Sequence, residues 1–121
     1  MDAKTIIMQE EKVSFQVAKL AKEKGFESNE RPAYNIEGIL QNTFNGEDTY
    51  YPAPTESLLQ RWLREVHNIH ITVYSLDKKY WCNFRNIKDE DTVLFISENY
   101  QTYEKVLEIG LFEALKLIKN K

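Results

Sequence analysis

The hydrophobic spacing of the chain changes abruptly near Asn68, and this change constrains the fold more than any other feature. Before Asn68, large apolar residues recur at helical spacing, at Leu58, Leu59, Trp62, Leu63 and Val66. After Asn68, apolar residues occupy every second position, at Ile69, Ile71 and Val73. A period of about 3.6 predicts an amphipathic helix, and a period of about 2 predicts a half-buried strand. We therefore expect a helix that is capped by Thr55 and ends at Asn68, followed at once by a strand.

The residues that follow predict two further strands and a long final helix. Asp77-Lys78 is a tight-turn candidate leading into residues 80–85, and the charged stretch 88–91 separates that strand from residues 92–97. Three such runs with short connections predict an antiparallel meander. Thr102 then caps a helix whose apolar stripe consists of Tyr103, Val106, Leu107, Gly110, Leu111, Ala114, Leu115 and Ile118. The small residues in this stripe allow the helix to approach the sheet closely.

The N-terminal part of the chain predicts one clear helix. Ser14 is a good N-cap, and Gly25 followed by Phe26 suits a left-handed C-cap, so we expect a helix between them. Residues 1–12 are expected to be a frayed lead-in, with a short strand at residues 5–8.

The segment between this helix and the next is less regular. Residues 34–40 and 49–51 are candidate strands joined around residues 45–48, although the same stretch also suits a recognition loop. The predicted fold is one α+β domain over residues 1–121, a three-stranded antiparallel meander flanked by helices. Its element order is α-[ββ]-α-β-β-β-α, with residues 55–118 as the core.

Composition and charge limit the classes of function. The chain has 121 residues, enough for one domain, and a single cysteine, which rules out an internal disulfide. No apolar stretch resembles a signal peptide or the roughly 20 residues of a membrane span, so we expect a cytoplasmic protein with no membrane partner. Residues 55–88 carry 6 basic and 3 acidic groups, whereas residues 89–113 carry 1 and 7. An acidic block beside a basic one argues against a dedicated nucleic-acid binder.

Residues that commonly carry catalysis or hold metals are few and widely spaced. His67, His70 and Cys82 are the only soft metal-ligand candidates, and they lack the short spacings of zinc motifs. Cys82 lies mid-strand, where a thiol usually serves packing. The run 89–91 is typical of a solvated turn, and the four glycines form no phosphate-binding loop. We therefore predict no enzyme activity, no metal and no cofactor.

Two apolar residues of the final helix lie outside its apolar stripe. Ile109 and Phe112 fall on the opposite, charged side of the helical wheel and need a cover. One interpretation is that the helix that follows Ser14, or residues 34–51, packs there. The other is a partner chain, most simply a second copy. Ile109 and Phe112 are therefore the predicted partner contacts.

The second face of the meander is a candidate binding surface of a different kind. If the helices cover Ile69, Ile71 and Val73, the residues that point outward are His70, Thr72, Tyr74, Asn83, Arg85 and, by extension, Trp81. Rows of aromatic and basic residues on a sheet can stack nucleobases, although such faces are more often half-solvated or covered.

A basic patch is the other nucleic-acid candidate. It would combine Arg61 and Arg64 with Lys78 and Lys79 if the helix and the hairpin turn lay together, and Arg85 would extend it. A solvated helix face explains the same residues more simply. These five residues are the predicted contacts of an alternative function, an RNA- or DNA-binding module.

The element order of residues 55–118 resembles that of a double-stranded-RNA-binding domain. That family carries a basic cluster at the start of its final helix, which contacts phosphates. Here the corresponding stretch, residues 98–105, is mostly neutral or acidic. The resemblance therefore implies a shared topology without the residues that bind RNA.

A resemblance over most of the chain is to a family of small proteins of bacterial genomes and their prophages. The segments that carry it are Val13-Ser14-Phe15, Ala18-Lys19-Leu20, Lys24-Gly25-Phe26, Ala53-Pro54-Thr55, Trp62-Leu63-Arg64-Glu65, Thr102-Tyr103-Glu104, Gly110-Leu111 and Glu113-Ala114-Leu115. It implies a prophage-type, standalone domain, and the family has no assigned activity. The function we expect is a non-catalytic module that binds a protein partner or itself, as a homodimer.

Overall fold

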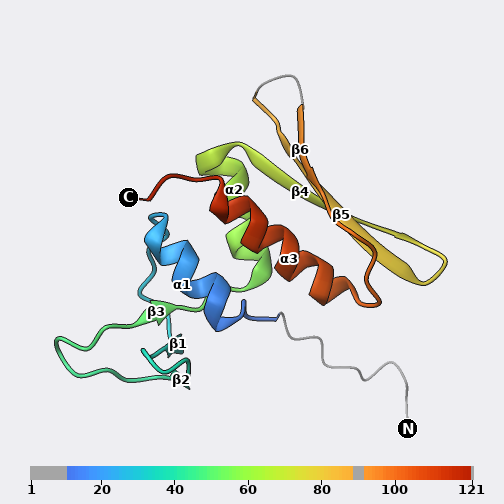
Figure 1. Cartoon of the computed structure of the whole chain (residues 1–121). Helices are drawn as coiled ribbons and strands as arrows, with labels where there is room; N and C mark the ends of the chain where they lie inside the picture. Colours follow the sequence, from blue (N-terminus) through green and yellow to red (C-terminus); the bar gives the residue numbers. More distant parts are fainter. Residues whose placement is uncertain (1–10, 89–91, 121) are drawn as a thin grey trace, which may run out of the picture.

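The computed structural model describes residues 11–88 and 92–120 (Figure 1). In chain order, its elements are α1 (Phe15–Glu23), β1 (Ala33–Tyr34), β2 (Leu40–Gln41), β3 (Tyr51–Pro52), α2 (Glu56–His67), β4 (Ile69–Leu76), β5 (Lys79–Asn86), β6 (Thr92–Ile96) and α3 (Tyr103–Lys116). Within these residues the helices combine with two antiparallel three-stranded sheets. The predicted α+β class is confirmed.

The larger sheet is the predicted meander. Its strand order is β4-β5-β6, and both pairs of neighbours are antiparallel. Asp77 and Lys78 form the turn between β4 and β5, with positive φ angles of 52° and 62°. Two consecutive residues of this kind make a tight turn whose twist matches that of the flanking strands. Residues 89–91, the end of the predicted charged turn, lie outside the described residues.

The change of spacing near Asn68 does mark a helix–strand junction. The hydroxyl of Thr55 accepts a hydrogen bond from the backbone N–H of Leu58 at 3.2 Å, which caps α2. At the other end, Asn68 takes a left-handed conformation with φ 59°, and β4 begins at the next residue. Asparagine is one of the few residues that tolerate this conformation, so it ends the helix cleanly.

The first helix begins and ends as predicted, and the last helix begins at its predicted cap. α3 ends at Lys116, so Ile118 of the predicted stripe lies beyond it. Ser14 caps α1 through a 3.3 Å hydrogen bond from the N–H of Val17. Gly25 is left-handed with φ 104°, and the N–H of Phe26 donates to the carbonyl of Ala21 at 3.0 Å. Thr102 caps α3 in the same way as Ser14 caps α1.

The segment before α2 differs from the prediction of two strands joined near residues 45–48. Residues 34–40 do not form one strand, because a tight turn divides them into β1 and β2. The side chain of Asn35 accepts hydrogen bonds from the N–H groups of Glu37 and Ile39, and Gly38 is left-handed with φ 84°. The smaller sheet therefore has three strands in the order β2-β1-β3.

The last residues of the predicted lead-in, 11 and 12, are not frayed, because hydrogen bonds join residues 11–13 to the segment that begins α2. The N–H of Val13 donates to the carbonyl of Pro54, and the N–H of Glu56 donates to the carbonyl of Glu11, both at 3.0 Å. Val13 is fully buried. Residues 11 and 12 thus belong to the folded structure, and the predicted strand at residues 5–8 lies outside the described residues.

The core lies between the larger sheet and the helices. α3 contacts β4 and β5, α2 contacts β4 and α3, and α1 packs on α3 away from the sheet (Figure 1). The apolar side chains that share this core, all buried, are Val13, Val17, Ala18, Ala21, Phe26, Leu59, Leu63, Ile69, Ile71, Cys82, Phe84, Val106, Leu107, Leu111, Ala114 and Leu115. The predicted stripe of α3 supplies five of them, so its orientation toward the sheet is confirmed.

Candidate interaction surface

The helices of the described chain cover only one face of the larger sheet. Alternation along β4 places Ile69 and Ile71 in the core, so His70, Thr72 and Tyr74 point to the other side. The register pairs these three residues with Arg85, Asn83 and Trp81 of β5. We call this second side the outer face, and its composition is the one predicted from the sequence.

A stacked aromatic pair stands on the outer face. The rings of Tyr74 and Trp81 are 5.3 Å apart between centroids and inclined by only 19°. The amide of Asn83 donates to the hydroxyl of Tyr74 at 3.4 Å, which helps to hold that ring in place. Because each ring restricts the other, the pair offers a rigid apolar surface that loses little side-chain entropy on binding.

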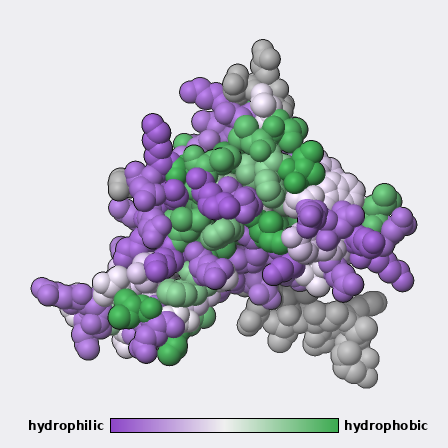
Figure 2. Space-filling view, viewed as in Figure 1, coloured by the Kyte–Doolittle hydropathy of each residue, from purple (hydrophilic) through white to green (hydrophobic). Residues whose placement is uncertain are grey.

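β6 adds an exposed apolar border to the outer face. Val93 and Ile96 lie across from Arg85 and Asn83, and their exposed fractions are 48% and 67%. The register shifts between Phe84 and Arg85, which leaves Leu94 as an extra, exposed residue on β6. Figure 2 shows hydrophobic side chains gathered below the grey atoms at its top, where Figure 1 draws β6. Sequence reasoning predicted this strand but did not single out its apolar residues as a site.

The predicted contacts Ile109 and Phe112 are half-buried beside α1. They line a groove of about 320 Å³ together with Ser14, Gln16, Val17, Lys105, Glu108 and Glu113. Glu108 draws α1 to this side of α3, because its carboxylate accepts hydrogen bonds from the N–H and the hydroxyl of Ser14, at 2.8 and 2.9 Å. Of the two interpretations, packing of the first helix therefore accounts for much of the cover that these residues need.

The predicted basic contacts do not gather in one place. Arg61 lies on α2 and pairs with Glu65 at 3.0 Å, and Arg64 lies one turn closer to the end of the same helix. Lys78 lies in the turn that follows β4, and Lys79 begins β5 opposite Leu76, the last residue of β4. An eight-residue strand spans about 26 Å, so the two groups stay apart.

The candidate metal ligands also point in different directions. His70 is on the outer face, whereas Cys82 is buried on the inner face. Burial raises the pKa of the Cys82 thiol, which makes it a poor nucleophile. Among the described residues, no group of three or more His, Cys, Asp and Glu side chains could hold a metal ion.

His67, the third candidate ligand, lies at the end of α2 against Trp62, with ring centroids 4.6 Å apart. Burial lowers the pKa of its imidazole below the ordinary value of 6.5, so the folded state favours the neutral ring. Unfolding then takes up a proton, and the contribution of His67 to stability is complete above about pH 6.5 and falls as the pH drops below it.

This sign gives a testable pH dependence. Between about pH 7.5 and pH 5.5, we expect the free energy of unfolding to fall less in His67→Phe than in the wild type, because Phe takes up no proton. Urea titrations at both pH values measure the difference. An equal fall in the two proteins would contradict a lowered pKa at His67.

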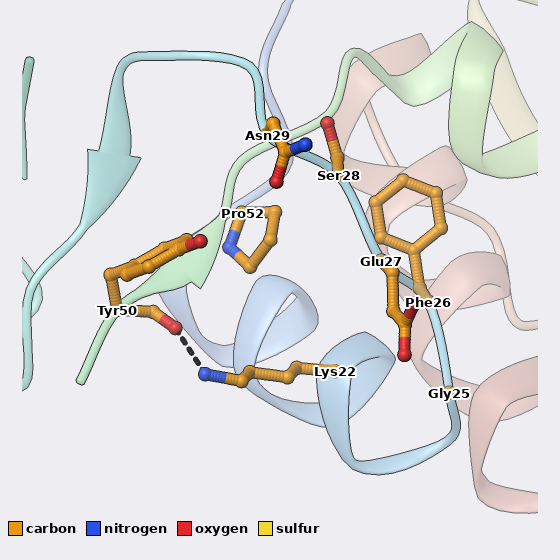
Figure 3. A pocket seen from close by; sticks show the side chains of 8 residues that line it. All are labelled: Lys22, Gly25, Phe26, Glu27, Ser28, Asn29, Tyr50 and Pro52. Atoms are coloured by element: carbon orange, nitrogen blue, oxygen red, sulfur yellow. Dashed lines mark hydrogen bonds between the residues drawn. The ribbon is translucent and has the colours of Figure 1, made fainter. Parts of the chain in front are cut away.

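A second concave site lies between the end of α1 and β3 (Figure 3). It has a volume of about 350 Å³ and is lined by Lys22, Gly25, Phe26, Glu27, Ser28, Asn29, Tyr50 and Pro52. In Figure 3, the rings of Tyr50 and Phe26 stand on opposite sides, and Lys22 donates to the carbonyl of Tyr50 at 2.5 Å. Arg31 lies over the ring of Tyr50, 4.2 Å from its centroid. Lys22 and Arg31 thus hold Phe44 and Tyr50, at the two ends of residues 44–50, against the domain. The sequence contains no local signal that predicts these long-range contacts.

Comparison with protein-family models, with curated proteins and with solved structures yields no significant match to this chain. The resemblance to prophage proteins thus stays a prediction. Within the residues that the structure describes, no helix has both the length and the apolar character that crossing a membrane requires.

Proposed function

We propose that this protein is a non-catalytic protein-interaction module whose main contact surface is the outer face of the larger sheet. The observation that carries the proposal is the exposure of Ile96 and Val93 beside the stacked pair of Tyr74 and Trp81, on the side of the sheet that the described helices leave uncovered. Contiguous exposed apolar surface on a folded domain is typical of a binding site for another macromolecule.

The composition of the face supports a protein partner. Burial of one aliphatic side chain such as Ile96 stabilises a complex by about 1.5–3 kcal/mol, and aromatic residues are the commonest anchors of protein interfaces. Polar residues alternate with these groups, among them Thr72 and Asn83, which suits an interface that also forms in water. A prophage origin and a cytoplasmic location belong to the same proposal. Their support is the sequence resemblance and the single cysteine.

The test compares two isoleucines of nearly equal exposure, one on β6 of the larger sheet and one in the turn between β1 and β2. Ile96 on β6 is 67% exposed and Ile36 beside β1 is 66% exposed. Tagged wild type, Ile96→Glu and Ile36→Glu are incubated with an extract of the cells that make the protein, and bound proteins are quantified by mass spectrometry. We expect recovery of a discrete partner to fall at least about tenfold for Ile96→Glu and to stay unchanged for Ile36→Glu. Equal recovery by both variants would contradict the proposal.

A second candidate, a nucleic-acid-binding module, is favoured by one observation: Lys79 and Arg85 share the outer face with the Tyr74–Trp81 pair. The separation of the other basic residues weighs against it. Titration of a fluorescent 20-nucleotide single strand at low salt separates the two functions. Our proposal predicts no binding, whereas binding that is lost in Trp81→Ala and weakens steeply with salt would favour nucleic acid.

A further inference from the structure

β4 forms one edge of the larger sheet, and its backbone geometry defines what this edge offers. In the described part of the chain, β4 pairs with β5 and with no other strand. The N–H of Ile87 donates to the carbonyl of Asn68 at 2.9 Å, so in the alternating antiparallel ladder the even-numbered residues of β4 bond to β5. The N–H and C=O groups of Ile69, Ile71, Val73 and Ser75 therefore point toward the open edge.

The two edges of this sheet differ in how they resist pairing with another strand. β6 has a bulge at Leu94, and the sequence places acidic residues on both sides of it, at 89–91 and at Glu98. Bulges and charges are common devices that keep an edge strand single. β4 has eight residues in unbroken register and contains no lysine, no proline, no acid and no bulge. An edge of this length and regularity is a template for a further strand.

We propose that β4 pairs in antiparallel fashion with β4 of a second copy, across a two-fold axis, to give a continuous six-stranded sheet. In the register that places Thr72 on the axis, Ile71 faces Val73 of the second copy and His70 faces its Tyr74. Opposed residues then lie on the same side of the joined sheet, as antiparallel pairing requires. Val73, only half-buried in one copy, joins a core that continues into the other.

Charge does not oppose the pairing of β4 with a second copy of itself. β4 contributes no Asp, Glu, Lys or Arg to the seam, so two copies of the strand meet without like-charge repulsion. At β6, the bulge at Leu94 breaks the register that a second copy would need, and Glu98 adds a negative charge just after that strand. The structure thus permits self-pairing at one edge and opposes it at the other.

The outline of the molecule leaves room for this pairing. The hairpin of β4 and β5 extends past the helices, whereas α2 packs near the beginning of β4 (Figure 1). Two-fold pairing places each projecting hairpin next to α2 of the other copy. The inference goes beyond the proposed function, because edge pairing uses backbone groups and leaves the outer face accessible in both copies.

The test measures the molar mass in solution of the wild type and of two variants, each with one lysine introduced on an edge strand, β4 or β6. Light scattering on the purified chain is expected to give about 28.6 kDa, twice the monomer mass of 14.3 kDa. In Thr72→Lys, two lysines face each other at the axis, and we expect a monomer. The matched variant Thr92→Lys carries the same change on β6 and is expected to remain a dimer. A wild-type mass of 14.3 kDa at high concentration, or a dimer in Thr72→Lys, would overturn the proposal.

Hydrogen exchange locates the interface without any substitution. The amides of Ile71 and Val73 are expected to exchange at least about tenfold more slowly at concentrations where the dimer predominates than at high dilution. The amides of Thr72 and Tyr74 already bond to β5 and are expected to change little. A dimer in which Ile71 and Val73 exchange at the same rate at both concentrations would place the contact elsewhere and contradict pairing at β4.

Discussion

Replacement of Phe84 by alanine is expected to lower the free energy of unfolding by about 3–5 kcal/mol, the largest effect of any single truncation in this protein. Phe84 is 1% exposed and is the largest fully buried side chain of the described core. It lies on the central strand, opposite Ile71, with its ring stacked on Phe95 at a centroid distance of 5.0 Å. Truncation removes this stacking and leaves a cavity that three strands and a helix cannot close without moving.

The measurement is the urea midpoint together with the slope of the unfolding transition. Phe44→Ala is the matched control, because Phe44 is half-buried in the segment before β3 and packs on Tyr50 and Arg31. We expect it to lose less than about 1.5 kcal/mol. A loss at Phe84 no greater than that at Phe44 would show that the core is not centred on β5.

Gly110→Val is expected to destabilise the fold by about 1–3 kcal/mol, although glycine is a poor residue for the middle of a helix. A Cβ atom at position 110 would lie 3.0 Å from Sγ of Cys82 and 3.2 Å from a methyl carbon of Ile71. Both neighbours are buried in the sheet, so α3 has to move away from it to accept the valine side chain. The loss of packing outweighs the gain in helix propensity.

Gly46→Val is the control for this substitution. A Cβ atom at Gly46 would meet no atom within 4 Å. We expect a change within about 0.5 kcal/mol there, measured by the same urea titration. If Gly110→Val were equally neutral, the close packing of α3 on the sheet would be wrong.

The sequence predicts the half of the fold that rests on local signals. The change of spacing at Asn68, the caps at Ser14, Thr55 and Thr102, and the turn at Asp77 each act within a few residues, and each appears at its expected place. Such signals are reliable because neighbouring residues alone satisfy the backbone groups that they involve.

The prediction was wrong where a local polar side chain outcompeted strand pairing. The apolar pattern of residues 34–40 suggests one strand, but the Asn35 side chain bonds to the N–H groups of Glu37 and Ile39 and closes a turn inside it. β1 pairs with β2, which follows it closely in the sequence, and also with β3, which follows much later. Spacing alone does not reveal which strands will be neighbours.

The candidate site illustrates the same limit. Helical geometry singles out Ile109 and Phe112, yet the cover they receive depends on the hydrogen bonds between Ser14 and Glu108, which are 94 residues apart. The exposure of Ile96 follows from the edge position of β6, which becomes known only once the strand order is established. The residues of the outer face on β4 and β5 were predictable from the sequence, but the exposed apolar residues of β6 beside them were not.

The central claim, that a protein partner binds the outer face, is tested most directly by photocrosslinking. A photoreactive phenylalanine analogue is introduced at Ile96 or at Ile36, and the cells that make the protein are irradiated. Both positions are equally exposed, so non-specific encounters label them to the same extent. The account predicts a discrete crosslinked protein of fixed mass from position 96 and none from position 36. The same set of products from both positions, or a discrete product from position 36 alone, would contradict it.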